Sequence, residues 1–244
     1  MKTKEYEFIG KTLFFPDYGI LVIGDLHLGY EHSVRQSGIL IPENQIKEVI
    51  SDLEKTFTKI KLINKKLKKI IFLGDIKHSF GYEKEEKNYF REVIDYLKQN
   101  INEKNILLIK GNHDTINYSS GKMKNYYIYK DIAFLHGHEL FTKVFDEKIK
   151  TIVMGHIHPS VILRDKQNIK REKYKCFLIG KFKNKNIIIL PSFLSTIEGN
   201  PVNSYKNNYE NSFSIISKKS LLNFQVFVIG EDKVYEFGKV KEMN

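Results

Sequence analysis

One pattern recurs five times in this sequence: an apolar run, then a glycine, with aspartate, asparagine or histidine beside it. The five copies read LVIGDLH, IIFLGD, ILLIKGNHD, IAFLHGH and TIVMGHIH and span Leu21–His27, Ile70–Asp75, Ile106–Asp114, Ile132–His138 and Thr151–His158. Buried parallel strands read as such runs, and open α/β sheets bind ligands beyond the carboxyl ends of their strands. Glycine lets the chain turn sharply there. The pattern therefore predicts a metal site.

The histidines support the same prediction. All eight lie in or close to these motifs, and none follows His158: His27, His32, His78, His113, His136, His138, His156 and His158. A single histidine is more often an ordinary surface or core residue than a ligand. Clustering of the whole set beside glycine-terminated strands favours metal ligands.

Length and composition favour one intracellular α/β domain. The chain has 244 residues, of which 41% are hydrophobic, enough for a full core. The charged start MKTKEYEFIG is unlike a signal peptide, and the apolar stretches are too short to span a membrane. The one cysteine, Cys176, permits no internal disulfide. We therefore expect a soluble, cytoplasmic protein without a membrane partner.

The charge balance favours an anionic substrate. Forty basic residues against 29 acidic ones give a net charge of +11. Such a surplus favours polyanions such as DNA or RNA. The lysines are scattered, however, so general lysine richness explains the surplus almost as well.

Hydrophobic spacing predicts an α/β arrangement followed by a more antiparallel part. Helical spacing over residues 46–60 and 90–101, between apolar strands from Ile20 to Ile109, indicates a βαβαβ unit. After Asp114 only a short helix near Glu139–Phe145 is expected. Strands are expected at Phe8–Phe15, Tyr126–Tyr129, Ile132–Leu135, Val161–Leu163, Lys175–Ile179, Ile187–Leu190, Phe213–Ile216 and Phe224–Val228. Asn200–Ser212 is polar and is the candidate for a mobile flap.

In this order, the motifs Asp25-X-His27, Gly74-Asp75, Gly111-Asn112-His113-Asp114, His136-Gly137-His138 and Gly155-His156-Ile157-His158 resemble the calcineurin-like metallophosphoesterase superfamily. The resemblance implies an α/β fold of two stacked mixed sheets flanked by helices, a four-layer α/β/β/α sandwich formed by residues 1–244 as a single domain. It implies hydrolysis of phosphodiester bonds by a metal-activated hydroxide, and no organic cofactor.

The resemblance also implies two divalent metal ions. Asp75 would bridge them. One ion would be held by Asp25, His27, Asp75 and His158, and the other by Asp75, Asn112, His136 and His156. Mixed carboxylate, imidazole and amide ligands suit Mn²⁺, our first choice, with Fe, Zn²⁺ and Ni²⁺ as alternatives. Two such ions, two aspartates and a hydroxide sum to about +1, which still attracts a phosphodiester anion.

Three further residues are assigned catalytic roles by the same resemblance. His113 would protonate the leaving oxygen or stabilise charge on the phosphoryl group. Asp114 either orients His113 or only caps the turn. His78 stands where many phosphatases have an aspartate, and histidine there resembles the nuclease branch, which includes the SbcD-type repair nucleases. The alternative is that His78 only supports the site.

Other fragments narrow the resemblance to archaeal SbcD-related and bacterial ligase-associated phosphoesterases, and extend it to about Asn203. They read DLHLGYE, LGDIKHSF, GHIHPSV, LPSF and GNPV. The full repair nucleases carry a DNA-capping region and an attachment segment for a partner ATPase, and we expect neither after these motifs. Nucleases of this kind dimerise, so a homodimer is one expected assembly, although no interface pattern stands out.

Three functions remain open from the sequence. The first is a phosphodiesterase acting on nucleic acid or nucleotides. The second is a small-molecule phosphodiesterase or phosphomonoesterase. The third is an inactive scaffold that binds RNA or a protein partner, which predicts missing ligands, whereas all are present. Tyr30 and Arg35 are candidates for substrate contacts, or alternatively for packing and for pairing with an acid. Cys176 is expected to be a packing residue.

Overall fold

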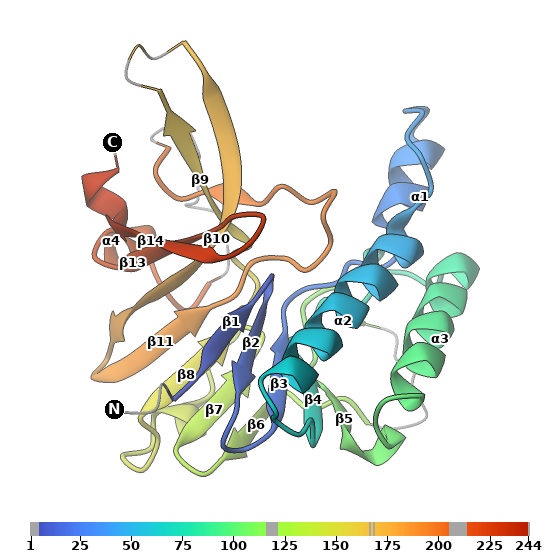
Figure 1. The fold of residues 1–244 in the computed structure, drawn as a ribbon, viewed down its shortest axis with the longest axis horizontal. Helices are drawn as coiled ribbons and strands as arrows, with labels where there is room; N and C mark the ends of the chain where they lie inside the picture. Colours follow the sequence, from blue (N-terminus) through green and yellow to red (C-terminus); the bar gives the residue numbers. More distant parts are fainter. Residues whose placement is uncertain (1–4, 116–121, 166, 168, 205–213, 244) are drawn as a thin grey trace.

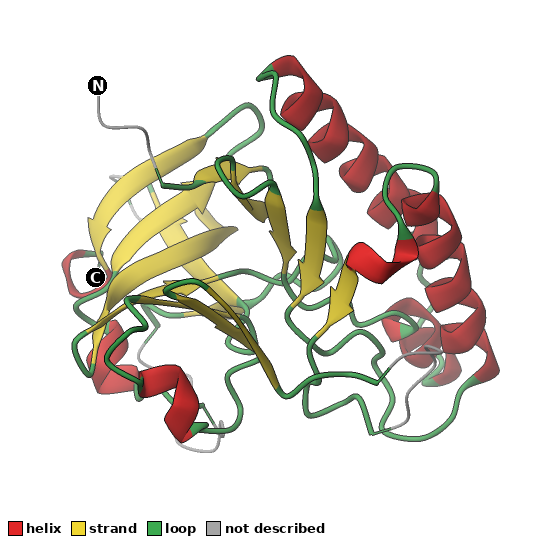
Figure 2. Ribbon diagram, turned by 90° about the horizontal axis from the view of Figure 1, so that it is seen from below, coloured by secondary structure: helices red, strands yellow, loops and turns green. Residues whose placement is uncertain are grey.

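The computed structural model describes residues 5–115, 122–165, 167, 169–204 and 214–243. Two β-sheets stack face to face, and helices cover the outer face of the first (Figure 1; Figure 2). This confirms the predicted α/β class with two mixed sheets. None of the described helices is long and apolar enough to cross a membrane.

The first sheet has five strands in the order β1-β2-β3-β4-β5. Strands β3, β4 and β5 run parallel, and the hairpin β1–β2 adds antiparallel strands at one side. The bounds are Glu7–Ile9 (β1), Thr12–Phe15 (β2), Ile20–Ile23 (β3), Lys69–Phe72 (β4) and Ile106–Leu108 (β5). The single strand expected over Phe8–Phe15 was wrong, because the chain turns at Gly10, whose φ is +55°.

The second sheet has nine strands in the order β12-β9-β10-β11-β8-β7-β6, with β13 pairing β10 and β14 pairing β13. Strands β7, β8 and β11 are parallel neighbours. The bounds are Tyr126–Tyr129 (β6), Ile132–Leu135 (β7), Thr151–Met154 (β8), Pro159–Arg164 (β9), Arg171–Phe182 (β10), Lys185–Ile189 (β11), Asn200–Pro201 (β12), Gln225–Ile229 (β13) and Val234–Lys239 (β14).

Helices α1 (Tyr30–Gln36), α2 (Gln45–Leu62) and α3 (Lys84–Lys98) lie together beside the first sheet, on the right of Figure 1. The expected apolar stripes face the core: Val49, Leu53, Phe57 and Ile60 of α2 and Phe90, Val93 and Leu97 of α3 are buried. They pack with Leu21, Ile70 and Phe72 of the sheet. Among the described residues, the helical elements on the outer face of the second sheet are the short helix α4 (Lys218–Leu221) and 3₁₀ turns.

A separate apolar cluster lies between the two sheets. Phe15, Val22 and Ile71 of the first sheet meet Phe134, Val153 and Ile188 of the second, all buried. Because both faces of β3 and β4 are therefore covered, these strands are apolar throughout, as parallel strands usually are. This cluster holds the carboxyl ends of both sheets in a fixed relation.

In three places after Asp114 the structure differs from the sequence prediction. The expected helix near Glu139–Phe145 is a 3₁₀ turn at Thr142–Phe145. The strand expected at Phe213–Ile216 was wrong: Ser214–Ile216 is not in a strand, and Phe213 lies outside the described residues. Of the expected flap, Asn200–Pro201 forms β12 beside β9, while residues 205–212 lie outside the described residues.

Candidate metal centre

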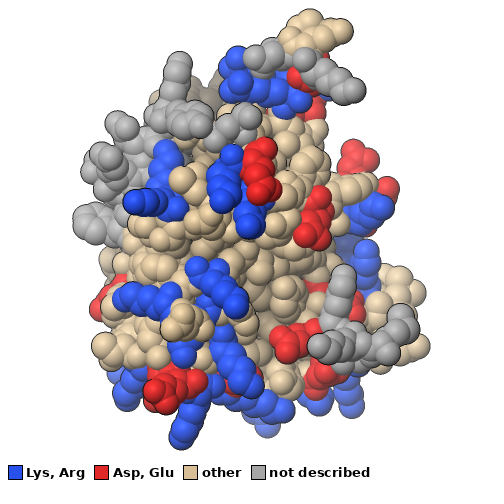
Figure 3. Space-filling model, turned by 90° about the vertical axis from the view of Figure 1, so that its left-hand side faces the viewer, with Lys and Arg blue, Asp and Glu red and all other residues tan. Residues whose placement is uncertain are grey.

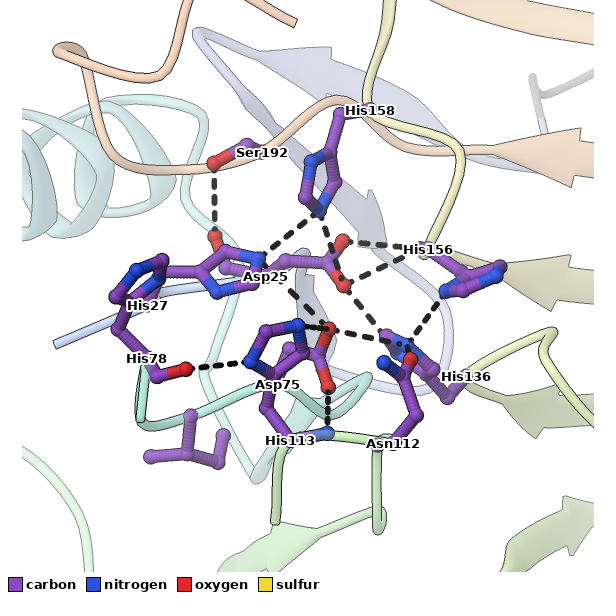
Figure 4. A network of polar contacts seen from close by, with 12 residues as sticks. Asp25, His27, Asp75, His78, Asn112, His113, His136, His156, His158 and Ser192 are labelled. Carbon is purple, nitrogen blue, oxygen red and sulfur yellow. Dashed lines mark hydrogen bonds and ion pairs between the residues drawn. The ribbon is translucent and has the colours of Figure 1, made fainter. Parts of the chain in front are cut away.

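Five loops converge at the carboxyl ends of strands from both sheets, and they carry the predicted site residues (Figure 4). Asp25 and His27 follow β3, Asp75 and His78 follow β4, Asn112, His113 and Asp114 follow β5, His136 follows β7, and His156 and His158 follow β8. The recurring pattern thus corresponds to five neighbouring strand ends. Residues up to 133 positions apart in the chain, counted from Asp25 to His158, come together there.

The first group of candidate ligands contains Asp25, His27, Asp75 and His158, whose ligand atoms all lie within 4.8 Å of one another. His27 Nε2 is 3.2 Å from His158 Nε2 and 3.7 Å from Asp75 Oδ2. His158 Nε2 is 3.5 Å from Asp25 Oδ1. Two imidazole nitrogens and two carboxylates therefore point at one small volume.

The second group contains Asp75, His136 and His156, again within 4.8 Å, with Asn112 beside them. His136 Nε2 lies 3.3 Å from Asp75 Oδ2, 3.0 Å from Asn112 Oδ1 and 3.0 Å from His156 Nδ1. The other nitrogen of His136, Nδ1, is 2.9 Å from the carbonyl oxygen of Leu73 and donates to it. A histidine held in this way presents Nε2 as its ligand atom. Asp75 belongs to both groups.

The donor chemistry of these groups fits divalent cations. His136 Nε2 can carry only one hydrogen, yet an amide oxygen, a carboxylate oxygen and an imidazole nitrogen surround it. His156 Nε2 is buried and has no hydrogen-bond partner among the described residues. The site thus holds more lone pairs than protons. Oxygen and imidazole donors in this mixture suit Mn²⁺, Fe or Zn²⁺ better than Ca²⁺.

Electrostatics keep both carboxylates ionised although both are buried. Burial raises the pKa of Asp25, but the charges of His158 and His136 outweigh it and bring the pKa down to about 2. Burial also raises the pKa of Asp75, and the hydrogen bond and charge of His136 hold that pKa well below its usual value. For His136, burial lowers the pKa, while Asp25 and Asp75 outweigh it and raise the pKa to about 9.

Two other histidines are kept neutral. Burial, with the charge of His158, lowers the pKa of His27 to about 3. Burial, with the charge of His136, lowers the pKa of His156 to about 4. A neutral imidazole has a free lone pair, which is the form that binds metal. Both side chains are therefore in their ligand form at neutral pH.

The backbone is strained at four of these positions. His27, Asp75, His156 and His158 have φ values of +45°, +45°, +68° and +48°. Positive φ is uncommon for residues other than glycine and clusters at functional sites. The turns after β3, β4 and β8 thus aim side chains inward at a conformational cost that the surrounding sheets must offset.

Two glycines leave room for the bridging and terminal carboxylates. A Cβ atom at Gly111 would lie 2.1 Å from Asp75 Oδ1, and one at Gly155 would lie 2.5 Å from Asp25 Oδ2. Real Cβ atoms do not approach so closely. The glycines after β5 and β8 are therefore required by packing against the ligands, in addition to turning the chain.

His113 lies at the edge of the first group. Its backbone N–H donates to Asp75 Oδ1 at 2.9 Å, and its Nδ1 donates to the carbonyl oxygen of His78. Its Nε2 is 4.0 Å from Asp75 Oδ2 and so faces the candidate metal site. The His78 ring stacks near it, with ring centroids 5.7 Å apart. His27, His78 and His113 also form a third group with ligand atoms within 4.8 Å.

Asp114 is buried and caps the turn. Its Oδ1 accepts from the backbone N–H groups of Ile76 (3.0 Å) and Lys77 (3.4 Å), and its Oδ2 accepts from Gly111 (2.9 Å). Of the two roles considered for Asp114, these contacts match the cap. The His113 ring is held instead by the carbonyl oxygen of His78.

The remaining sequence candidates fall around the site. The ring of Tyr30 packs edge-on against His78, with centroids 5.2 Å apart, and Arg35 pairs with Glu43 at 2.5 Å. Tyr30 thus packs and Arg35 pairs with an acid, as in the second of the two alternatives considered for each residue. The ring centroids of His138 and His136 lie 5.2 Å apart with the ring planes tilted by 58°, and His32 lies on α1 beside Gln36.

Three neighbours of the site were missed by sequence reasoning. Ser192 donates its hydroxyl group to the Asp25 carbonyl oxygen at 3.1 Å (Figure 4). Lys77 is buried and donates to the carbonyl oxygens of Ser79 and Gly81. Phe80 stacks on the ring of His113. Lys77 and Phe80 lie inside the LGDIKHSF segment, but neither residue type has a spacing that marks such a role.

Comparison with known protein families gives one match. Residues 18–180 match the family described as calcineurin-like phosphoesterase, which covers more than half of the chain and all five motifs. No curated protein matches the sequence.

Several solved structures are similar to this chain, and the first of them has a TM-score that indicates the same fold. Nuclease MPE from Pseudomonas putida has 18% sequence identity and a TM-score of 0.59, covering 93% of this chain and 92% of that one. A Vps29 single mutant from Entamoeba histolytica has 12% identity and a TM-score of 0.38, covering 90% and 99%. A predicted phosphoesterase from Streptococcus pneumoniae has 13% identity and a TM-score of 0.34, covering 90% and 97%.

Proposed function

The chain belongs to the calcineurin-like phosphoesterase family and is a metal-dependent phosphate-ester hydrolase, and from this premise we propose that it cleaves phosphodiester bonds in nucleic acid or nucleotides. We also propose that residues 1–244 act as a single domain of the SbcD-related branch. The apolar cluster shared by both sheets supports the single domain, and the likeness in fold to a Pseudomonas putida nuclease is compatible with the branch.

The residues proposed to hold two divalent ions are Asp25, His27, Asp75 and His158 for one, and Asp75, Asn112, His136 and His156 for the other. Both groups offer converging carboxylate and imidazole donors, which supports this division. Their mixed oxygen and imidazole character favours Mn²⁺. When bound, such ions supply an activated water nucleophile and neutralise charge on the phosphoryl group.

The observation that carries the diesterase proposal is the environment of His113. When a nucleic-acid diester is cleaved, the leaving group departs as an alkoxide and needs a proton. A histidine near neutral pH can supply that proton. Because the His78 carbonyl oxygen only accepts, His113 Nδ1 carries a hydrogen, and Nε2 is left as the nitrogen that faces the site and can exchange a proton with the substrate. His78 stands beside it where many phosphatases have a carboxylate, as in the nuclease branch that the sequence resembles.

The charge distribution supports an anionic substrate without identifying a binding groove. On the side that carries β11 and α4, Figure 3 shows Lys and Arg side chains over the upper and lower parts, with acidic and uncharged surface between them. The net charge of +11 nevertheless favours nucleic acid over neutral substrates.

The experiment compares Mn²⁺-dependent cleavage of bis-p-nitrophenyl phosphate, p-nitrophenyl phosphate, single-stranded DNA, duplex DNA and RNA. Asp75→Ala controls for contaminating nucleases. We expect polynucleotide cleavage that is lost in the variant. Cleavage of the small diester or monoester alone would instead support the small-molecule alternative. Absence of cleavage of every ester with two metals bound would support the scaffold alternative.

A further inference from the structure

An exposed aromatic ring lies directly on the proposed catalytic histidine. The ring centroids of Phe80 and His113 are 4.3 Å apart, with 25° between the ring planes. Phe80 is nevertheless 58% exposed. Single exposed apolar side chains are common and need no explanation. This one differs because its partner is a residue of the site and because its loop is firmly held.

The loop that carries Phe80 is fixed at consecutive residues. The buried ammonium group of Lys77 donates to the carbonyl oxygens of Ser79 and Gly81. The Ser79 N–H donates to Glu86 Oε1 at 2.6 Å, and the hydroxyl group of Thr115 donates to the Phe80 carbonyl oxygen. Burying a lysine is costly unless its hydrogen bonds are satisfied. The backbone of the loop is thus held by hydrogen bonds, and the Phe80 ring stacks on His113 although much of it faces solvent.

We propose that Phe80 is a stacking platform for the nucleobase next to the scissile phosphate. The inference rests on the proposed diesterase function and deepens it by naming the substrate class. His113 is proposed to act on the leaving oxygen, so a ring stacked on it is within reach of the adjoining nucleoside. Every nucleobase offers a flat π face, so stacking on an aromatic side chain tolerates any sequence.

The platform implies a preference for unpaired nucleotides. A base inside a duplex is already stacked on its neighbours and must be taken out of the stack before it meets a protein ring. Single strands, frayed ends and dinucleotides present their bases freely. From the position of Phe80 we therefore infer that this site binds single-stranded nucleic acid or short oligonucleotides.

The competing role for Phe80 is a shield that keeps water from one face of the His113 ring. A shield acts on every substrate, because every substrate uses His113. A platform acts only on substrates that carry a base. The two roles therefore separate when substrates with and without bases are compared.

The kinetic test uses Phe80→Leu, Phe80→Tyr and wild type on the dinucleotide TpT, on its two forms lacking one base, and on the form lacking both bases, a base-free ester whose leaving group is an alkoxide. Phe80→Leu should lower kcat/KM for TpT by about 5- to 100-fold, the range expected for one lost stacking contact. It should leave the base-free ester within about twofold, and Phe80→Tyr should restore TpT cleavage. One of the two forms lacking a base should be cleaved slowly by the wild type, and Phe80→Leu should not slow its cleavage further.

Equal losses on all substrates would establish the shield and overturn the platform, as would no loss on TpT. Phe237→Leu, an exposed aromatic on β14 that is 41% exposed, is the matched control and should leave all rates unchanged. Circular dichroism melting curves should coincide for all variants, since Phe80 is largely outside the core.

A binding measurement separates this inference from the proposed function. A 2-aminopurine dinucleotide with a phosphorothioate linkage should lose fluorescence on binding to wild type and retain it with Phe80→Leu. If the wild type cleaves no diester but this Phe80-dependent quenching occurs, the platform stands and the diesterase proposal fails. If quenching is absent or does not depend on Phe80, the platform is wrong whatever the enzyme cleaves.

Discussion

The imidazole ring of His113 is held through its Nδ1 atom by the backbone carbonyl oxygen of His78. A main-chain oxygen thus does what a carboxylate side chain would do elsewhere, and it adds no charge. The His78 ring remains available for a separate role beside the site, since its contacts with His27, Tyr30 and His113 are ring packing.

For His113→Ala, we expect a fall in kcat of about 100- to 10,000-fold, the usual contribution of a general acid. Metal content, measured by inductively coupled plasma mass spectrometry, should stay at the wild-type value because His113 belongs to neither proposed ligand set. Wild-type turnover in this variant would refute the proton-donor assignment.

His78→Ala should keep the carbonyl contact to His113, because that contact belongs to the backbone. We expect the ratio of diester to monoester kcat/KM to fall by about tenfold or more, the range typical of residues that support a site. The same ratio in variant and wild type would mean that His78 does not favour diesters. His32→Ala, on α1 beside Gln36, is the matched control.

Asp75→Ala should remove both metal ions and reduce activity by more than about 100-fold. Asp75 is the one residue that belongs to both ligand groups, and loss of a ligand costs more than loss of a supporting residue. Metal stoichiometry and turnover are measured on the same preparation. Asp232→Ala, at an exposed position, should behave as wild type, and retention of two ions by Asp75→Ala would contradict the bridge.

Gly111→Ala tests the packing of the bridging carboxylate. The new methyl group would lie 2.1 Å from Asp75 Oδ1, so the carboxylate and its strand end must shift. A displacement of about 1 Å at a catalytic group can cost 100-fold, and we expect at least that loss together with weaker metal binding. Gly10→Ala, in the β1–β2 turn with nothing within 4 Å of the added atom, strains the backbone because φ is +55°, but it lies outside the site and should keep full activity. Full activity in Gly111→Ala would show that the loop adapts.

Cys176 should not react with thiol reagents in the folded chain. It is fully buried, and burial raises the pKa of its thiol, so almost no thiolate is present between pH 7 and 9. Labelling by Ellman's reagent should be slow in buffer, should not accelerate up to pH 9, and should be complete in denaturant. Ser37→Cys, at an exposed position, gives the fast reference. Rapid labelling of native Cys176 would contradict its place in the core.

The sequence predicted the parts of the fold that depend on local patterns. Strands such as Ile20–Ile23 are continuous apolar runs because both of their faces are covered, and α2 follows a 3.6-residue stripe. The site residues could be named because they follow such strands within a few residues and because the order of their motifs resembles a known family. Their assignment to particular metals remains a prediction.

What the sequence could not predict depends on contacts between distant segments. The apolar run Phe8–Phe15 hides a hairpin because both of its arms are apolar, and only Gly10 marks the turn. Lysine is usually exposed, so nothing local predicts that Lys77 turns inward to the carbonyl groups of its own loop. The exposure of Phe80 and its position over His113 likewise depend on how two strand ends meet.

The left-handed backbone at His27, Asp75, His156 and His158 restricts which residues evolution can place there. Asparagine, aspartate, histidine and glycine tolerate this conformation, whereas β-branched residues do not. The first three are also metal ligands. Even without bound metal, valine or isoleucine would strain the chain at these four positions, so the backbone limits substitution there independently of the chemistry.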